Sequence, residues 1–247
     1  MAYMPGKPWR ILGAAAILTM PLLVLSLEVP ENDPSVSAAE MKPKALHSLL
    51  LDIAITDSGF VAVGERGHIL VSADGRSWQQ VKAPTRSTLT TVSAQGGAVW
   101  AGGHDGVILN SSDAGKTWQR QRAQPWSADS QLLTNGSPVL DTLFVSASEG
   151  YAVGAYSLLL KTVDGGATWS ELSIAGSAPA QQSSELVATD SGVFDDSDLT
   201  LAAESDPHLN AIARTASGRL LVMGERGAGF RSDDSGAEYM GASYPDP

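Results

Sequence analysis

The chain has 247 residues, of which 43% are hydrophobic and 17% are charged, so it carries enough apolar material for a sizeable core and its composition does not indicate global disorder. The absence of cysteine excludes disulfide bonds, thiolate nucleophiles and cysteine-ligated zinc. A formal net charge of −11 argues against nucleic acid as a partner, because phosphate binding requires a basic face.

Residues 1–38 have the pattern of an export signal. Lys7 and Arg10 precede an apolar run from Ile11 to Leu27 that holds no charge. The run is longer than a usual signal-peptide core and lies at the short limit of a spanning helix, so a cleaved signal peptide and an uncleaved membrane anchor both stay open. Small residues at 36–39 offer a cleavage site. Positive charges ahead of the run predict that the rest of the chain lies in the periplasm.

Residues 39–247 are predicted to form the folded part, because one pattern recurs in them four times. An apolar strand is followed by a glycine-containing turn, a second strand and then the motif Ser/Thr-x-Asp-(x)-Gly-x-Thr/Ser-Trp. The predicted repeats cover 46–83, 88–123, 139–175 and 208–245, and the inserts between them cover 124–138 and 176–207. A unit of about 40 residues is long enough for four short strands.

The motif recurs with small variations. The first copy is one residue short, and the fourth has Glu238 and Tyr239 at its last two positions. The predicted structural residues are Ser72, Asp74, Gly75, Trp78, Ser111, Asp113, Gly115, Trp118, Thr162, Asp164, Gly166, Trp169, Ser232, Asp234, Gly236 and Tyr239.

The chemistry of the motif explains these residue types. The aspartate accepts hydrogen bonds from backbone N–H groups of a tight turn, the glycine supplies a positive φ, and the aromatic ring packs between neighbouring sheets. One such unit leaves both faces of its sheet uncovered, whereas radial stacking buries the faces and protects the edges. The repeats therefore predict an all-β protein, a β-propeller of four-stranded blades.

The segments Ser111–Trp118 and Thr162–Trp169 resemble the Asp-box, or BNR repeat, of sialidases, sortilin-type receptors and related propellers. The Val-Gly-x-x-Gly-x-Ile/Leu-Leu hairpin ahead of each box is most similar to that of the photosystem II stability/assembly factor family, which has exported relatives in non-photosynthetic bacteria, some beside transporters. The resemblance covers roughly residues 46–240. It implies a non-catalytic scaffold that binds a membrane protein or membrane protein complex without a cofactor.

Four repeats are fewer than the six or seven that such family members usually show. The chain also stops at Tyr244-Pro245-Asp246-Pro247, directly after a box. We therefore expect part of a larger ring, truncated at the C-terminus, with a complete four-bladed ring as the alternative.

The topology of a four-stranded antiparallel blade places the 2–3 turns and the links between blades on one face, opposite the Asp-boxes. This face is the predicted partner-binding surface, and its candidate residues are Glu65, Arg66, His104, Asp105, Tyr156, Glu225, Arg226 and, from the first insert, Trp126. The alternative reading of the repeated Glu-Arg pair is a turn preference shared by duplicated units.

Metal binding is not predicted. The acidic second insert lacks the glycine and the final glutamate of a Ca²⁺ loop at the required spacing; its acidic residues are Asp190, Asp195, Asp196, Asp198, Glu204 and Asp206. His47, His68, His104 and His208 are scattered, and no carboxylate lies at ligand spacing from them in the sequence.

Catalysis is not predicted either. A sialidase needs an arginine clamp and a Tyr–Glu nucleophile pair, but the chain has no Arg-Ile-Pro motif and only 5 tyrosines. A sialidase-like glycoside hydrolase is one alternative function. A carbohydrate-binding propeller is the other, supported by Trp126 and Tyr156.

Overall fold

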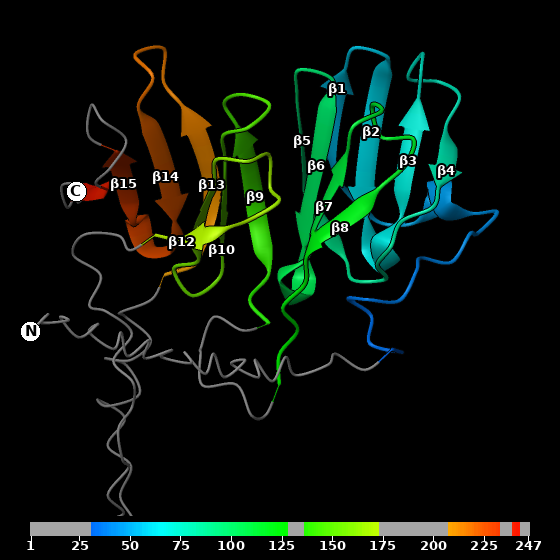
Figure 1. The fold of residues 1–247 in the computed structure, drawn as a ribbon, viewed down its shortest axis with the longest axis horizontal. Helices are drawn as coiled ribbons and strands as arrows, with labels where there is room; N and C mark the ends of the chain where they lie inside the picture. Colours follow the sequence, from blue (N-terminus) through cyan, green and yellow to red (C-terminus); the bar gives the residue numbers. More distant parts are fainter. Residues whose placement is uncertain (1–30, 128–135, 173–206, 233–238, 243–247) are drawn as a thin grey trace, which may run out of the picture.

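A computed structural model describes residues 31–127, 136–172, 207–232 and 239–242. In these residues the chain forms four antiparallel sheets of four strands each (Figure 1). The first two sheets consist of β1 (Leu50–Thr56), β2 (Gly59–Gly64), β3 (Ile69–Ser72), β4 (Gln79–Val81), β5 (Leu89–Gln95), β6 (Ala98–Gly103), β7 (Ile108–Ser111) and β8 (Gln119–Arg122). The other two consist of β9 (Val139–Phe144), β10 (Gly150–Gly154), β11 (Leu159–Thr162), β12 (Ser170–Glu171), β13 (Leu209–Arg214), β14 (Leu220–Gly224), β15 (Gly229–Ser232) and β16 (Tyr239–Ala242).

Within each sheet the strands pair in chain order, as expected for blades built from consecutive hairpins. We number the sheets blade 1 to blade 4. The 3-10 segment η1 (Ala45–His47) precedes blade 1, and the turns between the second and third strands of blades 1, 2 and 4 hold η2 (Glu65–Gly67), η3 (His104–Gly106) and η4 (Glu225–Gly227). The predicted all-β fold of Asp-box blades is confirmed.

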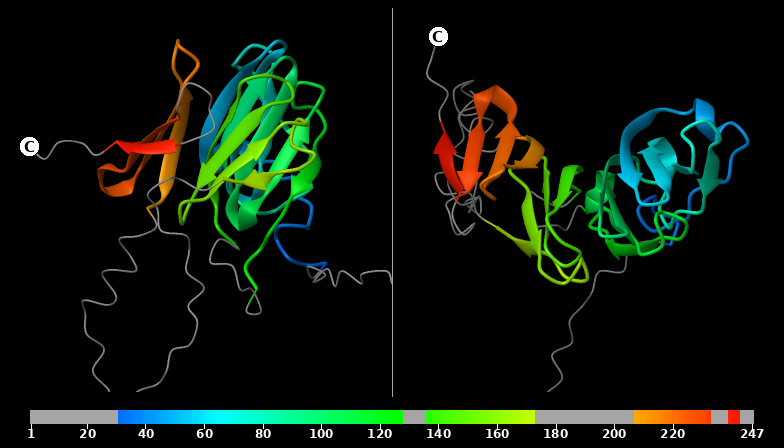
Figure 2. Two further views of the ribbon diagram at one scale, coloured as in Figure 1. Left: turned by 60° about the vertical axis from the view of Figure 1, so that its left-hand side comes forward. Right: turned by 90° about the horizontal axis from the view of Figure 1, so that it is seen from above.

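The four blades stand in chain order along an arc that is open in the view from above (Figure 2). The first strands β1, β5, β9 and β13 contact one another in sequence along the arc. Blade 1 and blade 4 therefore lie at its two ends. The described chain is a partial propeller.

The core lies between the blades. We call the face of a blade that points to the next blade its following face, and the opposite one its preceding face. Between blades 1 and 2, Val61 and Ile69 of one following face pack with Val99 and Leu109 of blade 2. This interleaving buries the β-branched and leucine side chains that alternate along each strand.

Aromatic rings reinforce the junction between blades 2 and 3. Trp100 of β6 stacks on Phe144 of β9 with ring centroids 3.5 Å apart, and Phe144 meets Trp169 edge-on at 6.0 Å. The Trp100 indole N–H also donates to the Gly165 carbonyl at 2.9 Å. The Asp-box of blade 3 is thereby attached to the following face of blade 2.

The segment ahead of blade 1 packs onto the blades. Ser35 and Ala39 are buried, the Arg86 N–H donates to the Pro34 carbonyl at 2.7 Å, and the Ala39 N–H donates to the Ala83 carbonyl at 2.9 Å. In the described ranges no helix is long and apolar enough to cross a membrane. The boundary between export segment and propeller stays a prediction.

Candidate partner-binding face

The Asp-box turns are closed around their own aspartates. In blade 2, Asp113 accepts hydrogen bonds from the Ser111 hydroxyl at 2.7 Å, the Thr117 N–H at 2.8 Å and the Thr117 hydroxyl at 2.6 Å. The Ser111 hydroxyl oxygen in turn accepts the Gly115 N–H at 2.9 Å. These bonds engage both carboxylate oxygens, so the side chain is committed to its own turn.

These hydrogen bonds also fix the charge of the box aspartates. The Thr117 hydroxyl and N–H lower the pKa of Asp113 to about 2, and the equivalent donors of Thr168 lower the pKa of Asp164 to about 2. Donors directed at a carboxylate stabilise its ionised form. Both side chains are therefore fixed acceptors at neutral pH and cannot act as general acids there.

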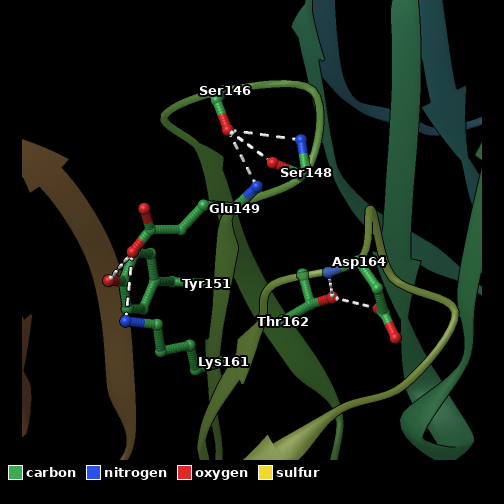
Figure 3. Close-up of polar contacts among 7 residues, drawn as sticks. All are labelled: Ser146, Ser148, Glu149, Tyr151, Lys161, Thr162 and Asp164. Carbon is green, nitrogen blue, oxygen red and sulfur yellow. Dashed lines mark hydrogen bonds and ion pairs between the residues drawn. The ribbon is translucent and has the colours of Figure 1, made fainter.

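The first and third boxes repeat this geometry. Asp74 Oδ1 accepts the N–H groups of Arg76 and Ser77, both at 2.8 Å, and the Thr162 hydroxyl donates to Asp164 at 2.8 Å (Figure 3). In the fourth box, Ser232 is buried. Asp234 and Gly236 lie outside the described residues, and Tyr239 is placed only as the first residue of β16.

Gly115 shows why this motif position is glycine. Its φ is +88°, in the left-handed region that side chains disfavour, and a Cβ there would stand 2.6 Å from Val61 Cγ2 of blade 1. The backbone of the blade 2 box therefore packs directly against the following face of blade 1.

The turns between second and third strands share a strained residue at one position. Arg66, Asp105, Tyr156 and Arg226 have φ values of 55°, 57°, 56° and 54°. Residues other than glycine rarely adopt this conformation. Because this conformation recurs, four side chains, two of them arginines, leave the backbone at equivalent points of the four blades.

Each of these turns is bonded to the link that enters the first strand of its own blade. The Glu65, His104 and Glu225 N–H groups donate to the carbonyls of Leu49, Thr88 and His208 at 3.0, 2.9 and 2.9 Å. Blade 3 repeats the bond from Ala155 to Pro138 at 3.1 Å. The turns and the links consequently lie together at one end of the blades, and the Asp-boxes lie at the other (Figure 1).

Some of the predicted residues meet on this face, and others are engaged separately. The Tyr156 and His208 rings meet edge-on at 5.1 Å, and His208 Nδ1 lies 3.4 Å from Glu225 Oε1. Asp105 instead accepts the Ser87 hydroxyl at 2.6 Å. Trp126 is 70% exposed and contributes an aromatic surface.

His208 is the residue that sequence reasoning missed, since Glu225 lies far from it along the chain. Comparison of the repeats contains a signal that would have revealed this pair. Glu65 Oε1 accepts the Leu49 N–H at 3.3 Å in blade 1, and Glu225 meets His208 at the equivalent place in blade 4. Aligning the repeats would have paired His208 with Glu225. By contrast, His68 is buried, and burial lowers its pKa.

A Tyr–Glu pair in blade 3 tests the glycosidase alternative. The Tyr151 hydroxyl donates to Glu149 Oε1 at 2.8 Å, and Lys161 Nζ lies 3.0 Å from the same oxygen (Figure 3). Tyr151 is only 3% exposed. Its burial raises the pKa of the phenol, and the hydrogen bond to Glu149 raises it further. A protonated, enclosed phenol has the opposite properties to a nucleophile, and Tyr151 instead belongs to the core at the junction with blade 4.

Metal ligands do not gather in the part of the chain that the structure describes. No group of three or more histidine, aspartate or glutamate side chains there could hold an ion. The acidic residues of the second insert, from Asp190 to Asp206, lie outside the described ranges.

With the box geometry in place, comparison with known proteins identifies the type of propeller. Residues 35–126 match the family described as photosynthesis system II assembly factor YCF48. The chain is an Asp-box β-propeller protein related to the photosystem II assembly factor. It is 37% identical over 70 residues to the photosystem II assembly lipoprotein Ycf48 of Prochlorococcus marinus. That match covers 28% of this chain and 20% of the relative.

A second relative with the same description, from Synechococcus sp. (strain RCC307), is 40% identical over 68 residues, covering 28% of this chain and 19% of its own. The chain thus matches about a fifth of the length of these curated relatives. These matches confirm the predicted resemblance, both for the propeller fold and for the relation to the photosystem II assembly factor.

Solved structures agree on the fold. A structure of YCF48 bound to D1 peptide gives a TM-score of 0.52 at 16% identity, with 81% of this chain and 54% of that chain covered. YCF48 from Cyanidioschyzon merolae gives 0.52 at 19% identity, covering 81% and 57%. The GH74 enzyme of Niastella koreensis also gives 0.52, at 13% identity, covering 78% and 30%. Because similarity at this identity shows architecture alone, the enzyme neighbour carries no activity over.

Proposed function

We propose that this chain is a non-catalytic assembly factor that holds a peptide segment of a membrane protein on the face formed by its 2–3 turns. The match of residues 35–126 to the assembly-factor family carries the proposal. A neighbour of the same fold is named as a peptide complex. The engaged box aspartates and the buried Tyr151 support a role in binding without catalysis.

The chemistry of the turn face suggests the kind of segment bound. Arg66 and Arg226 project from equivalent left-handed positions beside Glu65 and Glu225, and Trp126 adds an exposed ring. Charges of both signs around an aromatic surface suit a polar, extended peptide whose carboxylates pair with arginine. A surface of this kind is less suited to binding a lipid tail or a nucleic acid.

We further propose that the chain works in the periplasm, exported by the segment that begins with Lys7 and Arg10. The relatives are named as lipoproteins, which is consistent with an exported and membrane-associated protein. Whether the partner belongs to a photosystem or to a transporter is decided by the experiment below.

The test is a pull-down from membranes with the full chain, an affinity tag and mild detergent. We expect one stoichiometric membrane protein, whose recovery falls at least about tenfold for the Arg66→Ala/Arg226→Ala double variant. The matched control is Arg76→Ala/Lys116→Ala, which removes two exposed cations from the box turns at the opposite end. Equal loss in both variants, or no membrane partner together with activity on a glycoside panel, would contradict the proposal.

A further inference from the structure

A segment ahead of the first blade, residues 31–40, is bonded to blades 1 and 2, and we call it the strap. The Pro34 carbonyl accepts the Arg86 N–H at 2.7 Å and the Thr85 hydroxyl at 3.2 Å. The Arg86 guanidinium also donates to the Asn32 carbonyl at 3.2 Å. Because Thr85 and Arg86 belong to the link between blades 1 and 2, the first part of the strap is attached to that link.

The later part of the strap reaches the core and the outer strand of blade 2. Ala39 is buried in the core cluster between blades 1 and 2, and its N–H donates to the Ala83 carbonyl at 2.9 Å. The Arg120 guanidinium of β8 donates to the carbonyls of Ser35 and Val36 at 3.4 and 3.3 Å. A segment with buried residues and bonded carbonyls is an integral part of the fold.

This attachment bears on the fate of the export signal. The predicted cleavage site at 36–39 lies inside the strap, so cleavage there would remove Asn32 and Pro34. The Thr85 hydroxyl, which is buried, would then lose its acceptor, and a buried polar group without a partner destabilises a fold. The fold therefore favours a mature chain that keeps the whole strap.

The sequence ahead of the strap offers no other cleavage site of the usual kind. Residues 17–34 contain no two alanine, glycine or serine residues that stand two positions apart, although such a pair of small residues normally precedes the cut. The apolar run Ile11–Leu27 belongs to the residues outside the described ranges, and its length is at the short limit for a spanning helix. A chain that keeps its strap should therefore keep this run as well.

The strap joins the propeller at the end that carries the 2–3 turns. Its link lies against the first of these turns, since a Cβ on Gly67 would stand 2.1 Å from the Thr85 carbonyl oxygen. In the same link, the Ser87 hydroxyl donates to Asp105 of the second turn at 2.6 Å. Figure 1 shows the described start of the chain, in blue, at this end of the blades. The Asp-boxes lie at the opposite end.

Little chain separates the apolar run from the strap. Only residues 28–31 lie between Leu27 and Asn32, whose carbonyl is bonded to Arg86. Fully extended, this stretch spans at most about 18 Å. A six-residue strand of a blade is about 20 Å long, so the tether is too short to pass the blades and reach the strap if the boxes face the bilayer.

We propose that the apolar run stays attached as a membrane anchor and that the strap holds the 2–3 turn face towards the bilayer. The turn face then lies within about 20 Å of the membrane surface, and the Asp-boxes point away from it. This inference rests on the export segment and the strap, and it does not require the proposed peptide binding. Where both hold, the turn face is presented to segments that a membrane protein exposes at the bilayer surface.

The first test asks whether the apolar run is retained. The full chain with a C-terminal affinity tag is expressed, membranes are separated from the periplasmic fraction, and the purified chain is weighed by intact-mass spectrometry. We expect the chain in the membranes, released by detergent but not by a high-salt wash, with a mass that includes Ile11–Leu27. A mass that lacks this run would overturn the proposal, wherever the cleavage lies.

The second test measures orientation and uses the absence of cysteine in the chain. His104→Cys on the turn face and Lys116→Cys on the box turn replace two exposed residues at opposite ends of blade 2. A donor dye on each cysteine is read against an acceptor on the headgroups of phosphatidylcholine vesicles that hold the full chain. We expect at least about twofold more energy transfer from His104→Cys. Equal transfer, or more from Lys116→Cys, would contradict the proposed orientation.

A longer tether is the control for direct lipid binding. Twenty glycine and serine residues inserted between Glu31 and Asn32 add a flexible linker of about 25 Å. We expect the chain to stay in the vesicles while the difference between the two labelled positions falls by at least about half. An undiminished difference would mean that the turn face itself binds lipid, which would overturn the role of the strap. No peptide partner is present in these measurements, so their outcome is separate from that of the pull-down.

Discussion

At the scale of single residues, the box aspartates combine a low pKa with extensive hydrogen bonding. Asp113 is bound on both oxygens, by Ser111 and by two donors of Thr117. A carboxylate used in this way holds a loop of fixed shape and makes that loop sensitive to acid. The box is thus a folding device, and its recurrence along the chain does not by itself indicate a catalytic site.

Acid should weaken this device in a defined range of pH. The pKa of Asp113 is about 2 in the folded chain, below the value of about 3.9 in an unfolded one, so the stabilisation is full well above the unfolded value and is lost as the pH falls towards about 2. We expect Asp113→Asn to melt at a lower temperature than the wild type at neutral pH, and the difference to shrink as the pH falls from about 4 to about 2.5. Circular dichroism melts measure it, and a difference that does not depend on pH would contradict it.

At the scale of elements, one motif position has different surroundings in different blades. Trp118 is 8% exposed within the core between blades 1 and 2, whereas Trp78 of blade 1 lies on the open preceding face beside Ile53. Both indole N–H groups donate to the glycine carbonyl of their own box, at 2.8 and 3.2 Å. The local motif is the same, and what differs is whether a preceding blade covers the ring.

Truncation of the two rings should therefore have unequal effects. We expect Trp118→Ala to lower the free energy of unfolding by about 3–5 kcal/mol, and Trp78→Ala by less than about 2 kcal/mol. Urea denaturation of the wild type and of the two variants measures the difference. Equal losses would mean that the box indole stabilises its own turn and that packing between blades adds little.

At the scale of the whole molecule, the blades form a linear stack in which each sheet is stabilised by its neighbours. Blade 2 is covered on both faces, whereas among the described residues blade 4 is covered by a blade on its preceding face alone (Figure 2). In stacked repeat proteins, stability is the sum of the units and their interfaces, so terminal units open more readily.

Hydrogen exchange should reveal this gradient. We expect the amide of Val222 in β14 to exchange at least about tenfold faster than that of Ala101, its register equivalent in β6. Equal protection of the two amides would show that the four blades open as one unit.

Much of the architecture could be predicted from the sequence, because the determining interactions are local. Serine, aspartate and glycine at fixed spacing specify the box turn, and period-two alternation specifies the strands. Strands β5 and β13 accordingly begin at Leu89 and Leu209, one residue inside the predicted repeats 88–123 and 208–245. The sorting of turns and boxes to opposite ends follows from antiparallel pairing, which also needs no coordinates.

The relation between blades was decided by tertiary structure. Asp141 reads as an ordinary strand residue, yet it is bonded to Ile212 and Thr91, which lie far from it in the chain, and burial raises its pKa. The pairing of His208 with Glu225 is likewise a contact across sequence distance. By itself the sequence determined the blade, because a blade is closed by hydrogen bonds between near neighbours. The order in which faces meet, and the exposure of Ile53 at one end, depend on packing between units, which local pattern does not encode.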